Sequence, residues 1–189
     1  MIMLRKYDKY QDYLNHQKEK SLNKQRISNW LNEQWQPKID MFFNHFRRNR
    51  KYLKRDGKAL GICARTGQEI VALYKLGMNA VGVDIVPYPP LVVLGDAHSL
   101  PFKQEVFDFV FSNSFDHSIY PELFLSEMLR VLKYGGYGML HLQLTEDVDI
   151  YAENIVLDEQ EVIDLLNCEI LVNRKIKDIC YNREIIFKK

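Results

Sequence analysis

The sequence lacks several features that mark specialised classes of protein. It has only three cysteines, Cys63, Cys168 and Cys180, an odd number without metal-ligand spacing, so reduced thiols are expected rather than a disulfide framework. The net charge of +1 creates no field that would recruit nucleic acid or an anionic membrane. No apolar run approaches the ~18–20 residues of a membrane span, and the N-terminus has no signal-peptide core. We therefore expect a soluble, cytoplasmic protein.

Glycine is absent from residues 1–56, a segment that is rich in Lys, Arg, Gln and Asn. Apolar side chains at positions 39, 42, 43 and 46 follow helical spacing, which predicts a helix from Pro37 to about Arg55. A shorter helix is predicted at about 21–35. We expect residues 1–56 to form a helical extension, whose aromatic side chains serve either the core or a lid over a ligand site.

From residue 58 onward, strand and helix patterns alternate, which predicts a parallel sheet covered on both faces. The second strand and the next extended segment, "LVVLGDA", are separated only by "PYPP", too short for a crossover helix. Residues 91–94 are therefore expected either to form a short edge strand or to run extended beside the sheet. Residues 57–189 should form one α/β domain with a Rossmann-like, doubly wound sheet. This sheet is mostly parallel, trimmed between the second and third strands, and closed by an antiparallel last strand. The expected strands are 58–64, 79–86, 106–113, 137–144 and a terminal hairpin around "CYN", and the expected helices are 66–76, 120–133 and 158–167.

Residues suited to ligand binding follow the first two predicted strands, and ligands bind doubly wound sheets at such carboxyl ends. The loop "GICARTG" contains only two glycines, Gly61 and Gly67. Gly61 allows close backbone approach, and Thr66 can cap the next helix, whose N-terminal amides attract polar or anionic groups. Asp84 ends the second strand, where a carboxylate can accept two hydrogen bonds from a ribose diol.

Two further clusters follow the third and fourth extended segments. "GDAHSLPF" places Asp96 and Ala97 where an adenine edge would lie. "SNSFDHS" presents polar residues where a substrate would meet a cofactor. This second cluster comprises Asn113, Ser114, Phe115, Asp116 and His117.

The order and spacing of these motifs resemble the class I S-adenosylmethionine-dependent methyltransferases, in particular the methyltransferase-11-like, small-molecule group. The resemblance covers about residues 57–145 and is most specific in "VGVDIVP", "GDAHSLPF" and "FDFVFSNSFDHS…ELFLSEMLRVLKYGGYGML". The last segment is similar to the family's "FD-x-V … E-x-x-RVLKPGG" block. The resemblance implies S-adenosylmethionine as cofactor and methyl transfer to a small-molecule or carbohydrate-like acceptor, and the sequence supplies no metal site.

The first motif departs from the family's "D-x-G-x-G-x-G" pattern. Gly61 stands at the acid, and Cys63 and Arg65 stand at the first two glycines. Loss of the acid would weaken binding unless another group compensates. We favour Arg65 as that group, because a guanidinium can pair bidentately with the methionine carboxylate.

The resemblance assigns a role to each candidate residue. His117, beside Asp116, is the candidate base for a hydroxyl acceptor, and the absence of a "[DN]PP[YF]" signature also favours O-methylation. The cofactor-binding candidates are Gly61, Ala64, Arg65, Thr66 and Gly67 for the methionine part, Asp84 for the ribose, Ile85, Asp96 and Ala97 for the adenine, and Asn113 and Ser114 near the methyl group.

Each of these assignments has a structural alternative. Asp84 could cap the turn before Pro87, Asp96 could be an ordinary turn residue, and His117 could be a surface histidine bonded to Asp116. His141 fits a buried structural role as well as an acceptor pocket. The basic run at 47–55 fits a solvated helix face as well as a docking site for an anionic acceptor.

Two other functional classes remain open from the sequence. A nucleotide-binding oxidoreductase would require a G-x-G-x-x-G loop, which "GICARTG" does not match. A non-catalytic partner protein could keep the fold and lose the first motif. The sequence leaves the acceptor and the oligomeric state open, with a dimer as one alternative.

Overall fold

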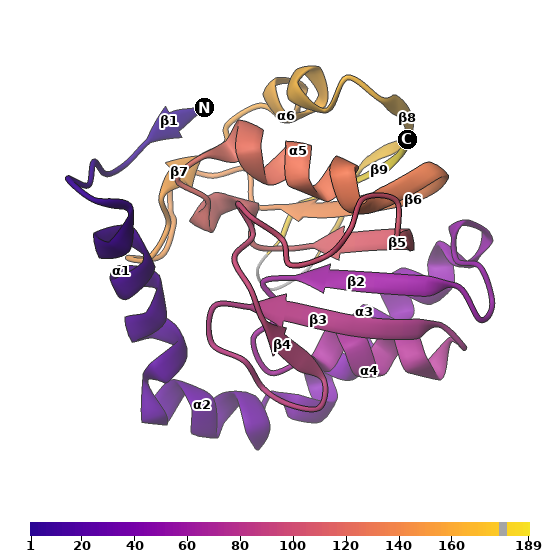
Figure 1. The fold of residues 1–189 in the computed structure, drawn as a ribbon, viewed down its shortest axis with the longest axis horizontal. Coiled ribbons are helices and arrows are strands. Elements are labelled where there is room, and N and C mark those ends of the chain that lie inside the picture. Colours follow the sequence, from indigo (N-terminus) through magenta and orange to yellow (C-terminus); the bar gives the residue numbers. More distant parts are fainter. Residues whose placement is uncertain (178–180) are drawn as a thin grey trace.

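The computed structural model describes residues 1–177 and 181–189, and its centre is a seven-stranded sheet (Figure 1). The strand order is β4-β3-β2-β5-β6-β9-β8; β2 to β6 run parallel, and β9 is antiparallel to both of its neighbours. The expected fold class and the closing antiparallel strand are therefore confirmed. Cys180 of the predicted "CYN" turn lies outside the described residues. The strands are β2 (Lys58–Ile62), β3 (Asn79–Asp84), β4 (Val92–Leu94), β5 (Phe107–Ser112), β6 (Leu132–Leu142), β8 (Glu169–Lys175) and β9 (Arg183–Lys188).

Helices cover both faces of the sheet because the central strands are apolar on both sides. Leu60 and Ile62 belong to one apolar core, which packs against α5 (Pro121–Val131) and α6 (Glu159–Leu166). Ala59 belongs to a second core on the opposite face, which packs against α3 (Trp35–Arg48) and α4 (Gln68–Lys75). Asp158 is the N-cap of α6, and its carboxylate accepts from the Gln160 N–H at 2.9 Å.

The N-terminal residues are helical, but their helix bounds differ from the prediction. The chain forms α1 (Tyr10–Leu22), α2 (Lys24–Leu31) and α3, followed by a 3₁₀ turn at Arg50–Tyr52. Pro37 lies inside α3 rather than before it, because the N–H groups of a helix's first turn have no partner within the helix and proline there removes no bond. The predicted single helix from 21 to 35 is wrong, since Asn23 is extended and separates α1 from α2.

Two other helix ends differ from the sequence expectation. The helix predicted at 120–133 ends at Val131, and Leu132 already starts β6. Gly135 and Gly136 do not terminate the helix but lie in an irregular stretch of β6, where the pairing with β5 shifts register and Gly135 has a φ of +74°. The helix predicted at 66–76 is α4, which starts at Gln68, two residues later than predicted.

The connection between β3 and β4 contains no helix, and of the two alternatives it is the short edge strand that forms. Val92 to Leu94 pair in parallel with Gly82 to Asp84. To pair in parallel with β3, the chain must return from the end of β3 to the start of the paired stretch. Because β4 has only three residues, at ~3.3 Å each, this return is short and a loop without a helix can span it. The trimmed architecture is therefore confirmed.

The N-terminal segment lies outside the sheet and across its carboxyl edge. In Figure 1, the arrowheads of β2, β3 and β5 point towards α1, which stands across the strand ends. A two-residue strand, β1 (Ile2–Met3), pairs with β7 (Asn154–Ile155) and ties the start of the chain to the segment after β6. None of the helices in the described part of the chain has the length and apolar character needed to cross a bilayer.

Candidate active site

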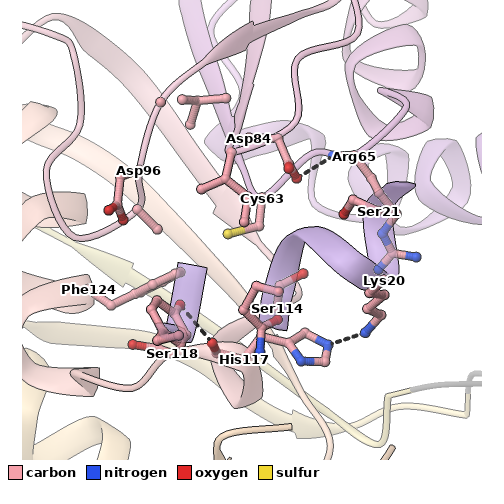
Figure 2. A pocket seen from close by; sticks show the side chains of 16 residues that line it. Lys20, Ser21, Cys63, Arg65, Asp84, Asp96, Ser114, His117, Ser118 and Phe124 are labelled. Atoms are coloured by element: carbon pink, nitrogen blue, oxygen red, sulfur yellow. Dashed lines mark hydrogen bonds between the residues drawn. The ribbon is translucent and has the colours of Figure 1, made fainter. Parts of the chain in front are cut away.

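A cavity of about 60 Å³ lies at the carboxyl edge of the sheet, beside α1 (Figure 2). Its walls come from α1, from the loops after β2, β3 and β4, and from the segment after β5. The sheet order places these loops side by side, although they lie far apart in sequence. Seven of the predicted residues line it: Arg65, Asp84, Ile85, Asp96, Ala97, Ser114 and His117. The other lining residues are Tyr13, Gln17, Lys20, Ser21, Cys63, Val83, Gly95, Ser118 and Phe124.

The loop after β2 is tied to the end of β3 by the Asp84 carboxylate. Asp84 Oδ2 accepts from the Arg65 backbone N–H at 3.0 Å, and Oδ1 accepts from the Val86 N–H at 2.9 Å. Cys63 and Arg65 adopt left-handed φ values of 59° and 54°, which let the loop turn tightly without glycine at either position. Figure 2 shows the Asp84 side chain directed at this loop.

Asp84 is also suited to hold a ribose diol. Burial raises the pKa of Asp84, against the two backbone N–H groups that lower it. A carboxylate has about four lone-pair sites, and these N–H groups use two of them. One acceptor site on each oxygen therefore remains on a side chain that lines the cavity, and the residues present fit a nucleoside.

Asp96 lies in a polar network that reaches α1. Its Oδ1 accepts from the His98 backbone N–H at 2.9 Å, and its Oδ2 accepts from the Tyr10 hydroxyl at 2.7 Å. The Tyr10 hydroxyl also lies 2.7 Å from His98 Nδ1. Burial alone would raise the pKa of Asp96, but the hydrogen bonds from His98 and Tyr10 outweigh it and lower the pKa. The first turn of α1 is therefore anchored where the adenine edge is predicted.

His117 is buried and has partners at both ring nitrogens. Nδ1 lies 2.8 Å from the Tyr151 carbonyl oxygen and donates to it, so Nε2 is left as the acceptor for Lys20 Nζ at 2.7 Å. Burial lowers the pKa of His117, and the Lys20 charge lowers it further, against the Asp116 carboxylate 3.7 Å from Nε2. His117 is therefore a neutral imidazole that lines the cavity and whose Nε2 is directed at Lys20 (Figure 2).

Two further cavities lie beyond the first. A small one of about 20 Å³ shares Cys63 and Arg65 with it and is also lined by Trp30, Lys38, Phe42, Ala64, Gln68, Glu69 and Asn113. A larger one of about 500 Å³ shares Lys38, Phe42 and Asn113 with the small one. The shared lining residues place the three cavities next to one another, from Asp96 in the first to Tyr181 in the large one. The remaining lining residues of the large cavity are Glu33, Gln34, Pro37, Met41, His45 and Lys177.

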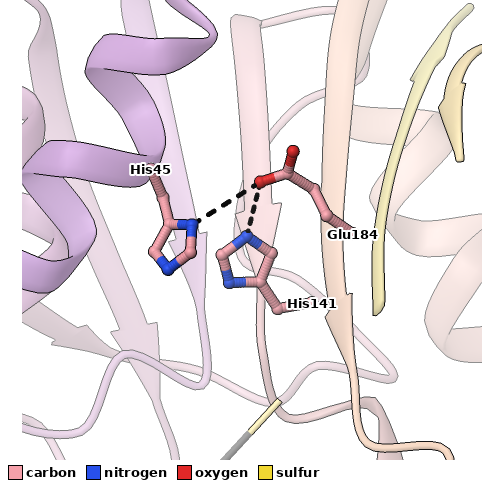
Figure 3. A group of neighbouring side chains, drawn as sticks. All are labelled: His45, His141 and Glu184. Carbon is pink, nitrogen blue, oxygen red and sulfur yellow. Dashed lines mark hydrogen bonds and ion pairs between the residues drawn. The ribbon is translucent and has the colours of Figure 1, made fainter. Parts of the chain in front are cut away.

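Beside the large cavity, His45, His141 and Glu184 form a buried group whose ligand-type atoms lie within 4.8 Å of one another (Figure 3). Glu184 accepts from His141 Nε2 at 3.1 Å and lies 3.8 Å from His45 Nδ1. Its carboxylate also pairs with Arg48 and Arg174 and accepts from Asn49. Although burial raises the pKa of Glu184, these partners lower it to about 2. Two guanidinium groups already neutralise the carboxylate, so the group is better suited to an ion-pair network than to a divalent cation.

His141 is buried in this network behind His45, and it does not line the large cavity.

Of the remaining predicted residues, two lie in cavity walls and four do not. Ala64 and Asn113 line the small cavity, whereas Gly61, Gly67, Thr66 and Asp116 line none of the three. The predicted capping role of Thr66 is wrong: Gly67, with a φ of +88°, is the N-cap of α4, and the Thr66 hydroxyl donates to Gln68 Oε1 at 2.8 Å.

Sequence reasoning missed Tyr10, Lys20 and Glu69, whereas Trp30 is one of the aromatic side chains of residues 1–56 that were expected to serve the core or a lid. Tyr10, Tyr13, Gln17 and Lys20 recur at helical spacing, and this repeat is a signal that could have indicated the covering face of α1.

A protein-family model and several solved structures resemble this chain. Residues 60–140 match a protein-family model described as a methyltransferase domain. No curated protein matches the sequence. Among solved structures, a SAM-dependent methyltransferase from Methanosarcina mazei is 20% identical, with 75% of this chain and 96% of that chain covered and a TM-score of 0.60.

Two other structures share the fold. The 1,6-didemethyltoxoflavin-N1-methyltransferase of Burkholderia thailandensis, with bound 1,6-didemethyltoxoflavin and S-adenosylhomocysteine, is 12% identical, covers 98% of this chain and 92% of its own, and has a TM-score of 0.71. A putative methyltransferase in complex with the Haloferax volcanii Trm112 activator is 15% identical, covers 85% and 96%, and has a TM-score of 0.65. At these identities the likeness is one of fold.

Proposed function

We propose that this chain, which carries a class I S-adenosylmethionine-dependent methyltransferase domain and has S-adenosylmethionine as its cofactor, methylates a small-molecule or carbohydrate-like acceptor, at oxygen. The observation that supports the proposal is the row of three neighbouring cavities that share lining residues. Residues suited to the cofactor line one end, and a cavity of about 500 Å³, within the size range of small-molecule sites, forms the other.

The chain's own residues would bind and orient the cofactor. Asp84 would accept from the ribose hydroxyls, and Asp96, Ala97 and Ile85 would surround the adenine. Arg65 would pair with the methionine carboxylate: its Cζ lies 4.6 Å from the centre of a Trp30 ring, and this cation–π contact orients the guanidinium beside the small cavity. When bound, S-adenosylmethionine supplies an electrophilic methyl group. The protein contributes mainly orientation.

The large cavity would hold the acceptor. Its walls combine apolar surface from Pro37, Met41 and Phe42 with the ammonium groups of Lys38 and Lys177. Such a mixture suits a polar or anionic small molecule with an apolar part. The Burkholderia methyltransferase of the same fold binds a small heterocycle, which supports an acceptor of this size.

His117 is the proposed base for a hydroxyl acceptor, because its Nδ1 donates to a carbonyl and Nε2 is left basic. Lys20 would have to move away from Nε2 before a proton could be accepted there. His45 is a second candidate, since it lines the large cavity itself. The two histidines can be separated by substituting each one.

Residues 1–56 would act as a lid. Tyr10 binds Asp96, the Tyr13 hydroxyl donates to the His117 carbonyl oxygen at 3.0 Å, and Lys20 contacts His117, so α1 closes the cofactor end of the cavity series. Trp30 and Lys38 extend this cover over the small cavity. The lid would exclude water from the reacting groups.

The first test is titration calorimetry with S-adenosylhomocysteine and, separately, NAD. Binding of S-adenosylhomocysteine and not NAD is expected. Asp84→Ala should abolish this binding, whereas Asp164→Ala, at an exposed position of α6, should leave it unchanged. Absence of S-adenosylhomocysteine binding at millimolar concentration would refute the proposal.

The second test is incubation with labelled S-adenosylmethionine and fractionated cell extract, which should yield a labelled small molecule. His117→Ala should keep cofactor binding and lose turnover. If His45→Ala has that effect instead, the base is His45. Binding without any labelled product would favour a non-catalytic partner protein.

A further inference from the structure

Glu69 is a buried carboxylate that none of the roles above uses. It lies in the first turn of α4, is only 4% exposed, and lines the small cavity together with Arg65 and Lys38. In the described part of the chain, its carboxylate accepts a hydrogen bond from its own backbone N–H, but no other side chain hydrogen-bonds to it or forms an ion pair with it. A carboxylate is costly to bury without partners, and such groups gather at functional sites.

The position of Glu69 is linked to the unusual glycine at the end of β2. A Cβ at Gly61 would lie 3.4 Å from Glu69 Cγ and 2.8 Å from Ile70 Cδ1. The side chain of Glu69 therefore occupies the space beside residue 61, where the sequence has no acid. The carboxylate enters this region from α4 instead of from β2.

The surroundings of Glu69 are polar and of both signs. Arg65 on the loop and Lys38 on α3 attract its negative charge, and Asp84 on β3 repels it. The small cavity thus presents the Arg65 guanidinium, held against Trp30, the Lys38 ammonium, and one carboxylate without a hydrogen-bonding side-chain partner. A ligand group that carries both an ammonium and a carboxylate matches these charges.

We propose that Glu69 binds the α-amino group of the methionine part of the cofactor, opposite Arg65, which pairs with the carboxylate of the same zwitterion. This inference rests on the proposed function, since it concerns how the chain holds S-adenosylmethionine. It makes Glu69 a cofactor-binding residue that replaces the absent acid at position 61.

The protonation of Glu69 gives the inference a pH signature. Burial is the main cause that raises the pKa of Glu69 to about 7 in the free protein. An ammonium binds the ionised carboxylate, so affinity for the zwitterion should increase as the pH rises from about 6 to 8. Burial also raises the pKa of the nearby Asp84, so the effect of Asp84 on the pH dependence of binding must be separated from that of Glu69.

Calorimetry with two ligands separates these contributions. S-adenosylhomocysteine carries the amino-acid zwitterion, whereas 5′-methylthioadenosine has the same adenine and ribose without it. Glu69→Gln keeps the side-chain shape and removes the charge. Glu122→Gln, at an exposed acid in the first turn of α5, is the matched control.

We expect Glu69→Gln to weaken S-adenosylhomocysteine about 10- to 100-fold, as for loss of a hydrogen bond to a charged group, and to change 5′-methylthioadenosine less than twofold. Between pH 6 and 8, the affinity of the Glu69→Gln variant for S-adenosylhomocysteine should rise no more than its affinity for 5′-methylthioadenosine. Equal affinity of wild type and Glu69→Gln for S-adenosylhomocysteine would overturn the inference and leave the proposed function intact. Failure of the wild type to bind either nucleoside would refute the proposed function itself.

Discussion

Lys20 Nζ lies 2.7 Å from His117 Nε2, so a cation on the covering helix contacts the candidate base. The same ammonium pairs with Asp149 Oδ2 at 2.9 Å. Burial and, second, the nearby Arg65 charge lower the pKa of Lys20 to about 8 despite the Asp149 carboxylate, so this ammonium gives up its proton more readily than an ordinary lysine. The protonation of His117 and the position of α1 are therefore coupled.

Lys20→Met should raise the pKa of His117. The substitution removes a positive charge that disfavours the imidazolium, and it frees Asp149, whose negative charge favours it. An NMR titration of the His117 ring measures this pKa directly. Lys18→Met, on the same helix, should leave it unchanged; an unaltered His117 pKa in Lys20→Met would show that the contact does not control the imidazole.

Tyr10→Phe should loosen α1 without unfolding the domain. The change removes the hydroxyl that donates to Asp96 over 2.7 Å, at a cost of about 1 kcal/mol. Hydrogen exchange of residues 10–22 should become faster. Tyr74→Phe is the control, because its hydroxyl donates to the Ala80 carbonyl at 2.7 Å, away from α1. Equal protection of α1 in both variants would contradict the anchoring role of Tyr10.

Gly61→Ala should destabilise the fold by about 1–3 kcal/mol, because the new Cβ would lie 2.8 Å from Ile70 Cδ1. Urea unfolding measures the loss. Ile70→Val removes the clashing methyl group, so the double variant should recover stability relative to Gly61→Ala. If the second substitution instead adds its own full cost, the crowding at Gly61 is not the cause.

Glu69→Gln should stabilise the free protein at pH 8 by about 1–3 kcal/mol. Its folded pKa of about 7 lies above the ordinary 4.5, so the folded chain holds the proton longer than the unfolded chain. The unfolding free energy of the wild type should therefore fall as the pH rises through this interval, and the variant should not show this fall. Denaturant unfolding at pH 4.5 and pH 8 tests it; a variant that is less stable at pH 8 would contradict the assigned pKa.

Glu184→Gln should have the opposite pH dependence. The folded pKa of Glu184 is lowered to about 2, so its contribution is complete above about pH 4.5 and is lost as the pH falls towards 2. At pH 7 we expect a loss of about 3 kcal/mol, because Arg48 and Arg174 lose their charged partner. The deficit should shrink in acid. Glu169→Gln, at an exposed position of β8, should cost little at any pH.

The sequence was sufficient to place the site residues that directly follow strands. Asp84 and Asp96 could be placed because their positions depend on local strand patterns and on the rule that ligands bind at the carboxyl ends of parallel strands. The structure brings both into one cavity with His117. Thr66 could not be placed correctly, because the choice between Thr66 and Gly67 as N-cap depends on a left-handed backbone angle that the sequence does not specify.

Residues that act across long sequence separations could not be assigned. Tyr10 meets Asp96, 86 residues away, and nothing local predicts where α1 docks. Glu69 has the sequence context of an ordinary first-turn acid on an amphipathic helix, which is favourable for the helix by itself. Its unusual environment depends on the burial of α4 against β2 and on the loop that contains Arg65.

The three-residue length of β4 also bears on how the sheet meets other molecules. An edge strand presents unpaired backbone groups to any chain that can extend the sheet, and short or charged edges discourage such pairing. At one edge β4 offers only Val92–Leu94, and at the other β8 carries Glu169, Arg174 and Lys175. The short length of β4 and the charged side chains of β8 both disfavour pairing with another chain. Self-association of copies through a continued sheet is therefore disfavoured at both edges.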